Sequence, residues 1–244
     1  MKVGMLGLSN PISEKRIQKE KIWLEENGVS VQVSPLLFKE STGKERAAVF
    51  NQWIQQDFDY IFDVSGGDLA NETLDWIDYE TFKNSSVIYF GYSDLTCVIN
   101  ALYTKTGKSS ILYQICANTN KRDLLSFLNK ESEELLENKE IVLGGNIRCF
   151  LKLAGSEYFP NLEKQTLFLE SYSGNEYRIR AYFAQLQTMG VFNKISKLIL
   201  GQYTEMEEKG QYDLVVDIAK KYCSKVEVLK TVGHSSNAKG LRIG

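Results

Sequence analysis

Histidine is nearly missing from this sequence: the 244 residues contain one, His234. The four cysteines lie far apart and form no Cys-x-x-Cys pair, so the ligand spacing of a structural zinc site is missing too. We therefore expect no metal site. Disulfides are rare in reducing compartments, so we interpret the cysteines as buried free thiols. They are Cys97, Cys116, Cys149 and Cys223.

Long apolar runs and an excess of positive charge are also lacking. No run approaches the ~18–20 apolar residues that span a bilayer. The 29 basic and 31 acidic residues leave a net charge of −2. We therefore expect neither membrane insertion nor nucleic-acid binding, which needs a clustered basic excess. The apolar start, Met1–Leu8, is too short for a signal peptide and has no small-residue cleavage site, which favours a cytoplasmic protein.

Strand and helix patterns alternate along the first half of the chain. Short apolar runs that end in turn residues predict buried strands, and stretches with helical spacing lie between them. This alternation predicts an α/β fold with a parallel sheet and helices on both faces. The expected strands cover residues 1–8, 29–33, 60–64 and 87–90, and the expected helices cover 14–27, 44–56, 71–77 and 95–103.

The character of the chain changes at residues 119–139, a highly charged segment with leucines at helical spacing. We interpret this segment as a connector between two domains; a surface helix within one domain is the alternative. Beyond it the patterns are mixed. The expected strands there begin with Glu140–Leu143 and continue at 165–169, 197–200 and 226–229, and the expected helices cover 147–154, 178–189 and 212–222.

Two nucleotide-binding motifs are incomplete. Gly107-Lys108-Ser109 matches the end of a P-loop, but Leu102 stands where the first glycine of that loop belongs. No Gly-x-Gly-x-x-Gly opens a helix after the first strand, so the dinucleotide fingerprint is missing as well. We therefore expect no cofactor. A flavodoxin-like nucleotide binder stays open as an alternative that rests on the strand–helix alternation alone.

Ser93 lies in Gly91-Tyr92-Ser93-Asp94, between an apolar strand and an apolar helix. Nucleophiles and ligands gather at such strand-to-helix turns, at the carboxyl edge of a parallel sheet. The backbone N–H of Asp94 can point from the first helical turn toward a developing oxyanion. The alternative is that Ser93 caps the helix, which is a common role for serine. Leu95 breaks the full Gly-x-Ser-x-Gly pattern.

Two further residues can complete a serine nucleophile. A serine hydroxyl needs a base, and His234 is the imidazole that the chain offers. Glu170 closes the apolar strand 166–169, from where it can accept the second ring N–H of a histidine. Glu163 and Glu176 are weaker candidates for this role. The alternatives are a surface-loop histidine and a solvated strand end.

Paired glycines follow the third expected strand as Ser65-Gly66-Gly67. Glycines at a strand end can present backbone N–H groups to an oxyanion, which makes this pair a candidate second half of an oxyanion hole. An ordinary glycine turn is the alternative.

The order of these features along the whole chain resembles the LD-carboxypeptidase family of serine peptidases, which includes microcin-C immunity peptidases. The most specific matching segment is Phe90–Thr96, followed by Gly144-Gly145-Asn146 and by Leu167–Glu170. The resemblance implies an N-terminal Rossmann-like domain at 1–118, which carries the nucleophile. It also implies a smaller C-terminal α+β domain at 140–244, which carries the glutamate and the histidine. Members are usually homodimers.

The resemblance also implies the site. The family's Ser-Glu-His triad falls on Ser93, Glu170 and His234, and its oxyanion hole falls on the backbone N–H groups of Asp94 and Gly67. It implies amide hydrolysis without a cofactor. The expected substrate is a murein peptide, cleaved at the L,D bond to its terminal D-amino acid. A toxic aminoacyl-nucleotide amide, as in microcin immunity, is the second substrate class.

A carboxypeptidase needs a cation for the terminal carboxylate of its substrate. Arg178 is our first candidate, with Arg180 and Lys239 as alternatives. Gly66 and Asn146 complete the expected substrate-binding residues.

This sequence departs from the family pattern around the expected substrate pocket. Ser65 stands where an arginine usually precedes the glycine pair, and Ile179-Arg180-Ala181 replaces Ile-Asp-Arg. The usual Gly-Pro is missing at 112–115, and the connector is short. The chain ends soon after His234, where members usually continue with another strand. These departures keep a catalytically lapsed, peptide-binding homologue open as a rival function.

Overall fold

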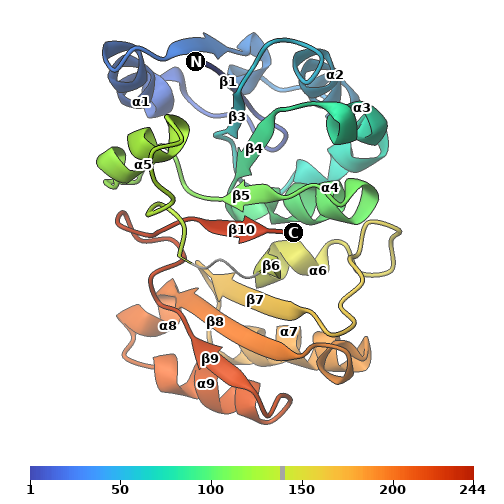
Figure 1. Ribbon diagram of the computed structural model, residues 1–244. Coiled ribbons are helices and arrows are strands. Elements are labelled where there is room, and N and C mark those ends of the chain that lie inside the picture. The colour runs from blue at the N-terminus through green and yellow to red at the C-terminus, as the bar shows by residue number, and fades with distance from the viewer. Residues whose placement is uncertain (138–140) are drawn as a thin grey trace.

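The computed structural model of the chain describes residues 1–137 and 141–244. The strands of these residues join into a ten-stranded sheet in the order β2-β1-β3-β4-β5-β10-β6-β7-β8-β9 (Figure 1). The strands are β1 (Lys2–Leu6), β2 (Ser30–Val33), β3 (Tyr60–Asp63), β4 (Ile88–Gly91), β5 (Ser110–Leu112), β6 (Val142–Asn146), β7 (Thr166–Ser171), β8 (Lys197–Tyr203), β9 (Val226–Val228) and β10 (Leu241–Ile243).

Helices connect the strands and cover both faces of the N-terminal half of the sheet (Figure 1). The α-helices are α1 (Glu14–Glu26), α2 (Gly43–Trp53), α3 (Tyr79–Asn84), α4 (Thr96–Thr106), α5 (Lys121–Leu128), α6 (Ile147–Leu151), α7 (Glu176–Thr188), α8 (Thr204–Glu208) and α9 (Tyr212–Lys220). The 3₁₀ helices are η1 (Pro35–Phe38), η2 (Ala70–Trp76), η3 (Ser93–Leu95) and η4 (Val191–Asn193).

The sheet consists of two parallel groups of strands. Neighbours within β1–β5 pair in parallel, and so do neighbours within β6–β9. Strand β10 joins the groups, because it pairs antiparallel with β5 and in parallel with β6. The predicted α/β class with a mostly parallel sheet is thereby confirmed, and the β5–β10 pair is an antiparallel exception.

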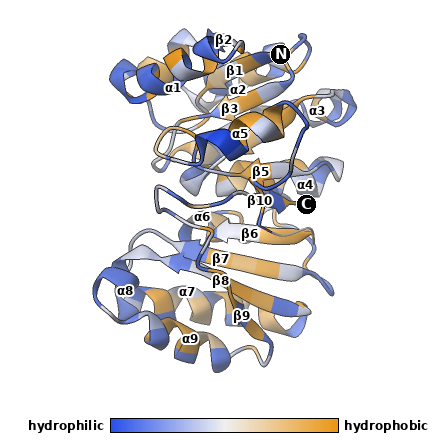
Figure 2. Ribbon diagram, turned by 60° about the vertical axis from the view of Figure 1, so that its left-hand side comes forward, coloured by the Kyte–Doolittle hydropathy of each residue, from blue (hydrophilic) through white to orange (hydrophobic). Residues whose placement is uncertain are grey.

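The hydrophobic core continues from one group of strands to the other. One cluster of buried side chains includes residues of α2 and α4 together with residues of β6, β7 and α7. A second cluster lies under α1 and α5 and contains Phe62 and Phe90 of the sheet. Hydrophobic residues concentrate on the strands and on the helix sides that face them, and hydrophilic residues lie outside (Figure 2).

Helix α4 connects the two halves of the chain next to the predicted nucleophile. Its residues Thr96–Leu102 are all buried, as expected for a helix that is covered on every side. The side chain of Asn100 donates to the carbonyl of Gly144 at 2.8 Å and accepts the N–H of Gly144 at 2.9 Å. The backbone N–H of Asn146 donates to the hydroxyl of Thr96 at 3.0 Å. The end of β6 therefore lies against the first turn of α4.

Sequence patterns missed β5, β10, α3 and α8. These elements have three to six residues each, and such short segments often show too little of a period to be recognised. Because β10 follows His234, a strand does lie beyond the histidine. The expected strand start at Glu140 lies outside the described residues, as do the last two residues of the expected connector. The domain bounds 1–118 and 140–244 stay a prediction.

Candidate active site

Ser93 occupies a strained turn directly after β4. Its φ of +54° lies in the left-handed region, which costs a non-glycine residue about 1–2 kcal/mol. A Cβ on Gly91 would lie 2.8 Å from the Cβ of Leu95, so the turn needs glycine there. The N-cap residues of η3 and α4 are Tyr92 and Leu95, and neither makes a side-chain cap bond. Ser93 is therefore not the helix cap of the alternative interpretation.

Glu170 and His234 form a direct, buried pair. The Nδ1 atom of His234 lies 2.7 Å from Oε2 of Glu170, and the two side chains are 8% and 0% exposed. Glu170 lies near the end of β7, in register with Asn146 of β6. Glu163, a weaker candidate from the sequence, is exposed. Among the carboxylates considered, the structure therefore brings Glu170 to the histidine.

The imidazole of His234 lies between two tyrosine rings. Its ring centroid is 4.5 Å from that of Tyr92 and 4.9 Å from that of Tyr172. Tyr92 directly precedes Ser93 in the chain, so the histidine packs against the neighbour of the predicted nucleophile. Its Nε2 atom is buried and has no hydrogen-bond partner among the described residues. The structure thus joins Glu170 to His234 and leaves Nε2 without a bond to Ser93.

The loop that carries His234 is fixed from two sides. Gln202 of β8 accepts the N–H of Ser235 at 2.9 Å and donates to its hydroxyl at 2.8 Å. From the last residue of the expected N-terminal domain, Asn118 donates to the carbonyl of Ala238 at 2.6 Å. These bonds hold the histidine loop against both halves of the chain.

The glycine pair forms a loop that Asn10 organises. The Oδ1 atom of Asn10 accepts the N–H groups of Asp68 at 2.7 Å and Leu69 at 3.2 Å. Gly67 has a φ of +122°, and a Cβ on it would lie 2.3 Å from the same Oδ1 atom, so only glycine fits. Gly66 pairs with Asn10 in a β-bridge, and no described atom lies within 4 Å of where its Cβ would be.

A buried hydrogen-bond network links the glycine loop to the nucleophile turn. Asp63 accepts bonds from the hydroxyls of Ser65 at 2.6 Å and Tyr89 at 2.9 Å. The Ser65 hydroxyl accepts the N–H of Ser9 at 3.0 Å, and the Ser9 hydroxyl donates to Asp94 at 2.6 Å. Burial raises the pKa of Asp63 to about 6, although these hydrogen bonds act in the opposite direction.

Asn146 has a structural task besides its predicted one. Its Oδ1 atom accepts the N–H of Cys149 at 3.3 Å and so caps α6. Its position in register with Glu170 keeps it beside the histidine pair.

The predicted cations for a substrate carboxylate lie at the surface. Arg178 is exposed in the first turn of α7, shortly after the strand that carries Glu170. Arg180 pairs with Glu176 at 3.5 Å, and Lys239 pairs with Glu137 at 3.7 Å. Of the three, Arg178 keeps its predicted role as a proposal.

The described residues contain no group of three or more His, Cys, Asp or Glu side chains that could hold a metal ion. Within the same ranges, no helix is both long and apolar enough to cross a membrane.

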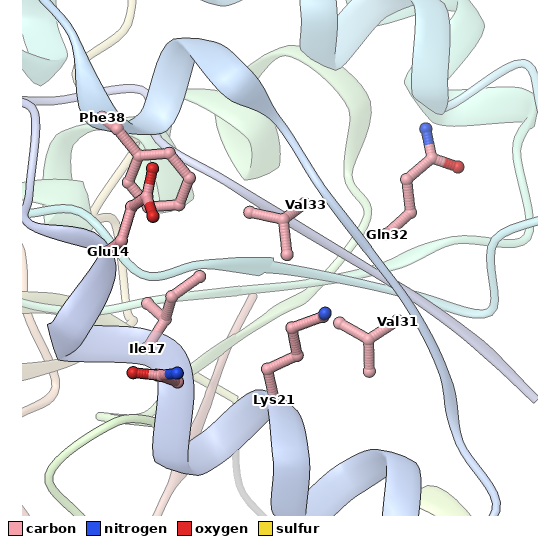
Figure 3. Close-up of a pocket in the computed structure, with 8 residues that line it drawn as sticks. Glu14, Ile17, Lys21, Val31, Gln32, Val33 and Phe38 are labelled. Carbon is pink, nitrogen blue, oxygen red and sulfur yellow. The ribbon is translucent and has the colours of Figure 1, made fainter.

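A pocket of about 600 Å³ lies between α1 and the edge strand β2, with Ile17, Lys21 and Phe38 among its lining residues (Figure 3). None of the predicted site residues lines that pocket.

Two family models match the chain, one on each side of residues 114–139. The first, described as the LD-carboxypeptidase N-terminal domain, matches residues 3–113. The second, described as the LD-carboxypeptidase C-terminal domain, matches residues 140–244. The chain belongs to the LD-carboxypeptidase family. A relative from Vibrio cholerae named as a carboxypeptidase is 24% identical over 271 residues, which cover 88% of this chain and 81% of that protein.

Solved structures share the fold of this LD-carboxypeptidase family member. A structure of MccF in complex with glutamyl sulfamoyl guanosine matches with a TM-score of 0.84 and 22% identity, over 100% of this chain and 91% of that one. Muramoyltetrapeptide carboxypeptidase from Oxalobacter formigenes matches with a TM-score of 0.83 and 18% identity, over 100% and 93%. These proteins thus have a common architecture.

Three residues that surround the site of this family member were not predicted from its sequence. Tyr172, which covers the imidazole, is 59% exposed. Arg148 and Lys152 bond to the glycine loop from α6. Their i, i+4 spacing after Gly144-Gly145-Asn146 places two cations on one helix face, which is a pattern that the sequence did contain.

Proposed function

We propose that this protein is a serine carboxypeptidase with Ser93 as nucleophile, His234 as base and Glu170 as the residue that orients the base. One observation carries the proposal: the buried Glu170–His234 pair packs against Tyr92, which directly precedes a serine whose backbone is held in the left-handed region. Strain of this kind persists where the surrounding structure over-determines it, and it clusters at functional sites.

The reaction follows from the chemistry of these groups. His234 takes the hydroxyl proton of Ser93 through Nε2 as the oxygen attacks the scissile carbonyl, and Glu170 stabilises the resulting imidazolium. The N–H groups of Asp94 and Gly67 hold the tetrahedral oxyanion; loss of one such donor typically costs ~2.7–4 kcal/mol of barrier. His234 returns the proton to the leaving amine. Water then cleaves the acyl-enzyme by the same route.

The substrate that we propose is a murein peptide with a terminal D-amino acid. The supporting observations are the family membership and the names of relatives. Arg178, Gly66 and Asn146 are the proposed substrate contacts. The open space beside Gly66 and the position of Asn146 next to Glu170 agree with this assignment.

An aminoacyl-nucleotide amide is the second candidate substrate. Tyr172 presents a largely exposed ring directly over His234, and such a ring can stack on a nucleobase. The related MccF binds aminoacyl-sulfamoyl nucleosides in its solved complexes.

A fluorophosphonate probe, which reacts with activated serines, separates an enzyme from a binding protein that has lost activity. We expect covalent labelling of the wild type at Ser93, and its loss in Ser93→Ala and His234→Gln. Ser236→Ala is the matched control, because this exposed serine lies in the same loop and outside the proposed machinery. An unlabelled wild type that binds murein peptide would replace the proposal with the lapsed binder.

Substrate identity is tested by parallel incubation with murein tetrapeptide and with an aminoacyl-sulfamoyl adenosine, with the products identified by mass spectrometry. Release of the terminal D-alanine supports the murein assignment. Release of the amino acid from the nucleoside alone would establish the second candidate instead. A Tyr172→Ala variant should lose activity on the nucleoside substrate far more than on the peptide.

A further inference from the structure

Two cations contact the loop of the glycine pair: Arg148 on α6 and Lys152 at the C-cap of this helix. We call them the α6 cations. The Nη2 atom of Arg148 donates to the carbonyl of Gly67 at 3.0 Å, while Nη1 pairs with the carboxylate of Asp68. The side chains of Arg148 and Asp68 are 40% and 66% exposed. Arg148, from the C-terminal half of the chain, therefore binds the loop at two adjacent residues.

The peptide unit that follows Gly67 is held at both ends. Its carbonyl accepts the bond from Arg148, and its N–H, which belongs to Asp68, donates to Asn10 at 2.7 Å. Gly67 has a φ of +122°, a conformation that other residues avoid. With the following peptide pinned, the rotation of Gly67 is restricted, and so is the direction of its own N–H.

Lys152 connects the same loop to the nucleophile turn. Its ammonium donates to the carbonyl of Asp68 at 2.7 Å and pairs with the carboxylate of Asp94. That carboxylate is fully buried and also accepts the N–H of Ala70 at 2.9 Å and the hydroxyl of Ser9 at 2.6 Å. One ammonium thus bridges the two segments that contain Gly67 and Asp94.

We propose that Arg148 and Lys152 are positioning residues that hold the N–H groups of Gly67 and Asp94 at the spacing of an oxyanion hole. This inference rests on the proposed function. An oxyanion hole works because its donors need not reorganise as charge develops, and a displacement of about 1 Å in a site can cost ~10²-fold in rate. The glycines make the loop intrinsically flexible, and the bonds from the α6 cations restrict its motion.

The test measures the rate at which a fluorophosphonate labels Ser93, together with kcat and KM on the better substrate. We expect Arg148→Gln to lower the labelling rate and kcat about tenfold or more, with KM within about threefold of the wild-type value. Arg148→Lys should recover only part of the rate, because an ammonium lacks the two-pronged geometry of a guanidinium.

Arg242→Gln is the matched control. Arg242 of β10 is 32% exposed and pairs with Glu133, which is 61% exposed. The substitution therefore removes an ion pair that is about as exposed as the Arg148–Asp68 pair. It should label at the wild-type rate. Thermal unfolding of each variant verifies that the labelled population is folded.

Lys152→Met leaves the carboxylate of Asp94 buried without its cation, so it should lower both the melting temperature and the labelling rate. Lys152→Arg restores the charge and should regain much of the rate.

A folded Arg148→Gln variant that labels Ser93 at the wild-type rate would overturn the inference and leave the proposed function intact. A large rise in KM with unchanged kcat would do the same, because it would make Arg148 a substrate-binding residue. A wild type that fails to label refutes the proposed function itself and, with it, the role of the α6 cations.

Discussion

Replacement of Glu170 by glutamine removes one charge from the proposed site and almost no volume. The carboxylate is fully buried, and its Oε2 atom lies 2.7 Å from Nδ1 of His234. In the proposed reaction the imidazole becomes positively charged in the transition state. The variant loses the attraction between this charge and the carboxylate, which raises the free energy of the transition state more than that of the ground state.

The magnitude follows from the geometry. Two unit charges about 4 Å apart interact by roughly 4 kcal/mol at an effective dielectric of about 20. Because ~1.4 kcal/mol corresponds to a tenfold change in rate, Glu170→Gln should lower kcat by about 10³-fold. Stability should stay near the wild-type value. The amide can accept the same hydrogen bond from Nδ1 and costs less to bury than a charge.

The assay compares kcat and KM for the wild type, Glu170→Gln and Glu163→Gln, with melting temperatures measured in parallel. Glu163 is exposed and serves as the matched control, with kcat expected at the wild-type value. A folded Glu170→Gln variant that keeps more than a tenth of wild-type kcat would refute the orienting role of Glu170.

Four further predictions concern stability and the histidine loop. Asp63 has a raised pKa of about 6, above its value of about 3.9 in an unfolded chain. The folded state therefore binds this proton more tightly, and the Asp63 contribution to the free energy of unfolding should fall by up to about 3 kcal/mol as pH rises from 4 to above 6. Urea titrations at several pH values in this range should show that the free energy of unfolding falls more steeply with pH for the wild type than for Asp63→Asn. Equal pH dependence in the two proteins would contradict the prediction. Ser93→Gly should be about 1 kcal/mol more stable than Ser93→Ala, because glycine relieves the left-handed strain; chemical denaturation measures the difference, and equal stabilities would argue against a strained turn. Gly144→Ala should unfold at a clearly lower temperature, since its Cβ would lie 2.1 Å from the carbonyl oxygen of Phe168; an unchanged melting temperature would show that this packing is looser. Gln202→Ala should lower kcat, because three hydrogen bonds from its side chain hold the loop of His234; unchanged kinetics would mean that the loop keeps its position without them.

Local patterns were sufficient where an element is long and periodic, or where a residue type is rare. Strand β7 and helix α7 were expected close to their observed positions because their apolar spacing is regular. The histidine was singled out because the chain has no other. Ser93 and Glu170 were selected because strand ends gather functional groups, and their order along the chain matched a family pattern.

Short elements and long-range contacts were beyond reach of those patterns. Strand β10 has three residues, and only its place between β5 and β6 makes it part of the sheet. The α6 cations form no local motif whose partners can be named, since Gly67 and Asp94 lie 81 and 58 residues away from the cations that bond to them.

The amino-acid sequence by itself determined the α/β class, the family and the three side chains that we propose for catalysis, because these depend on periodicity, residue rarity and order along the chain. Tertiary structure alone decided which rings enclose the imidazole and which cations hold the glycine loop. Those contacts arise from packing α4 against β6, which joins segments that no local spacing relates.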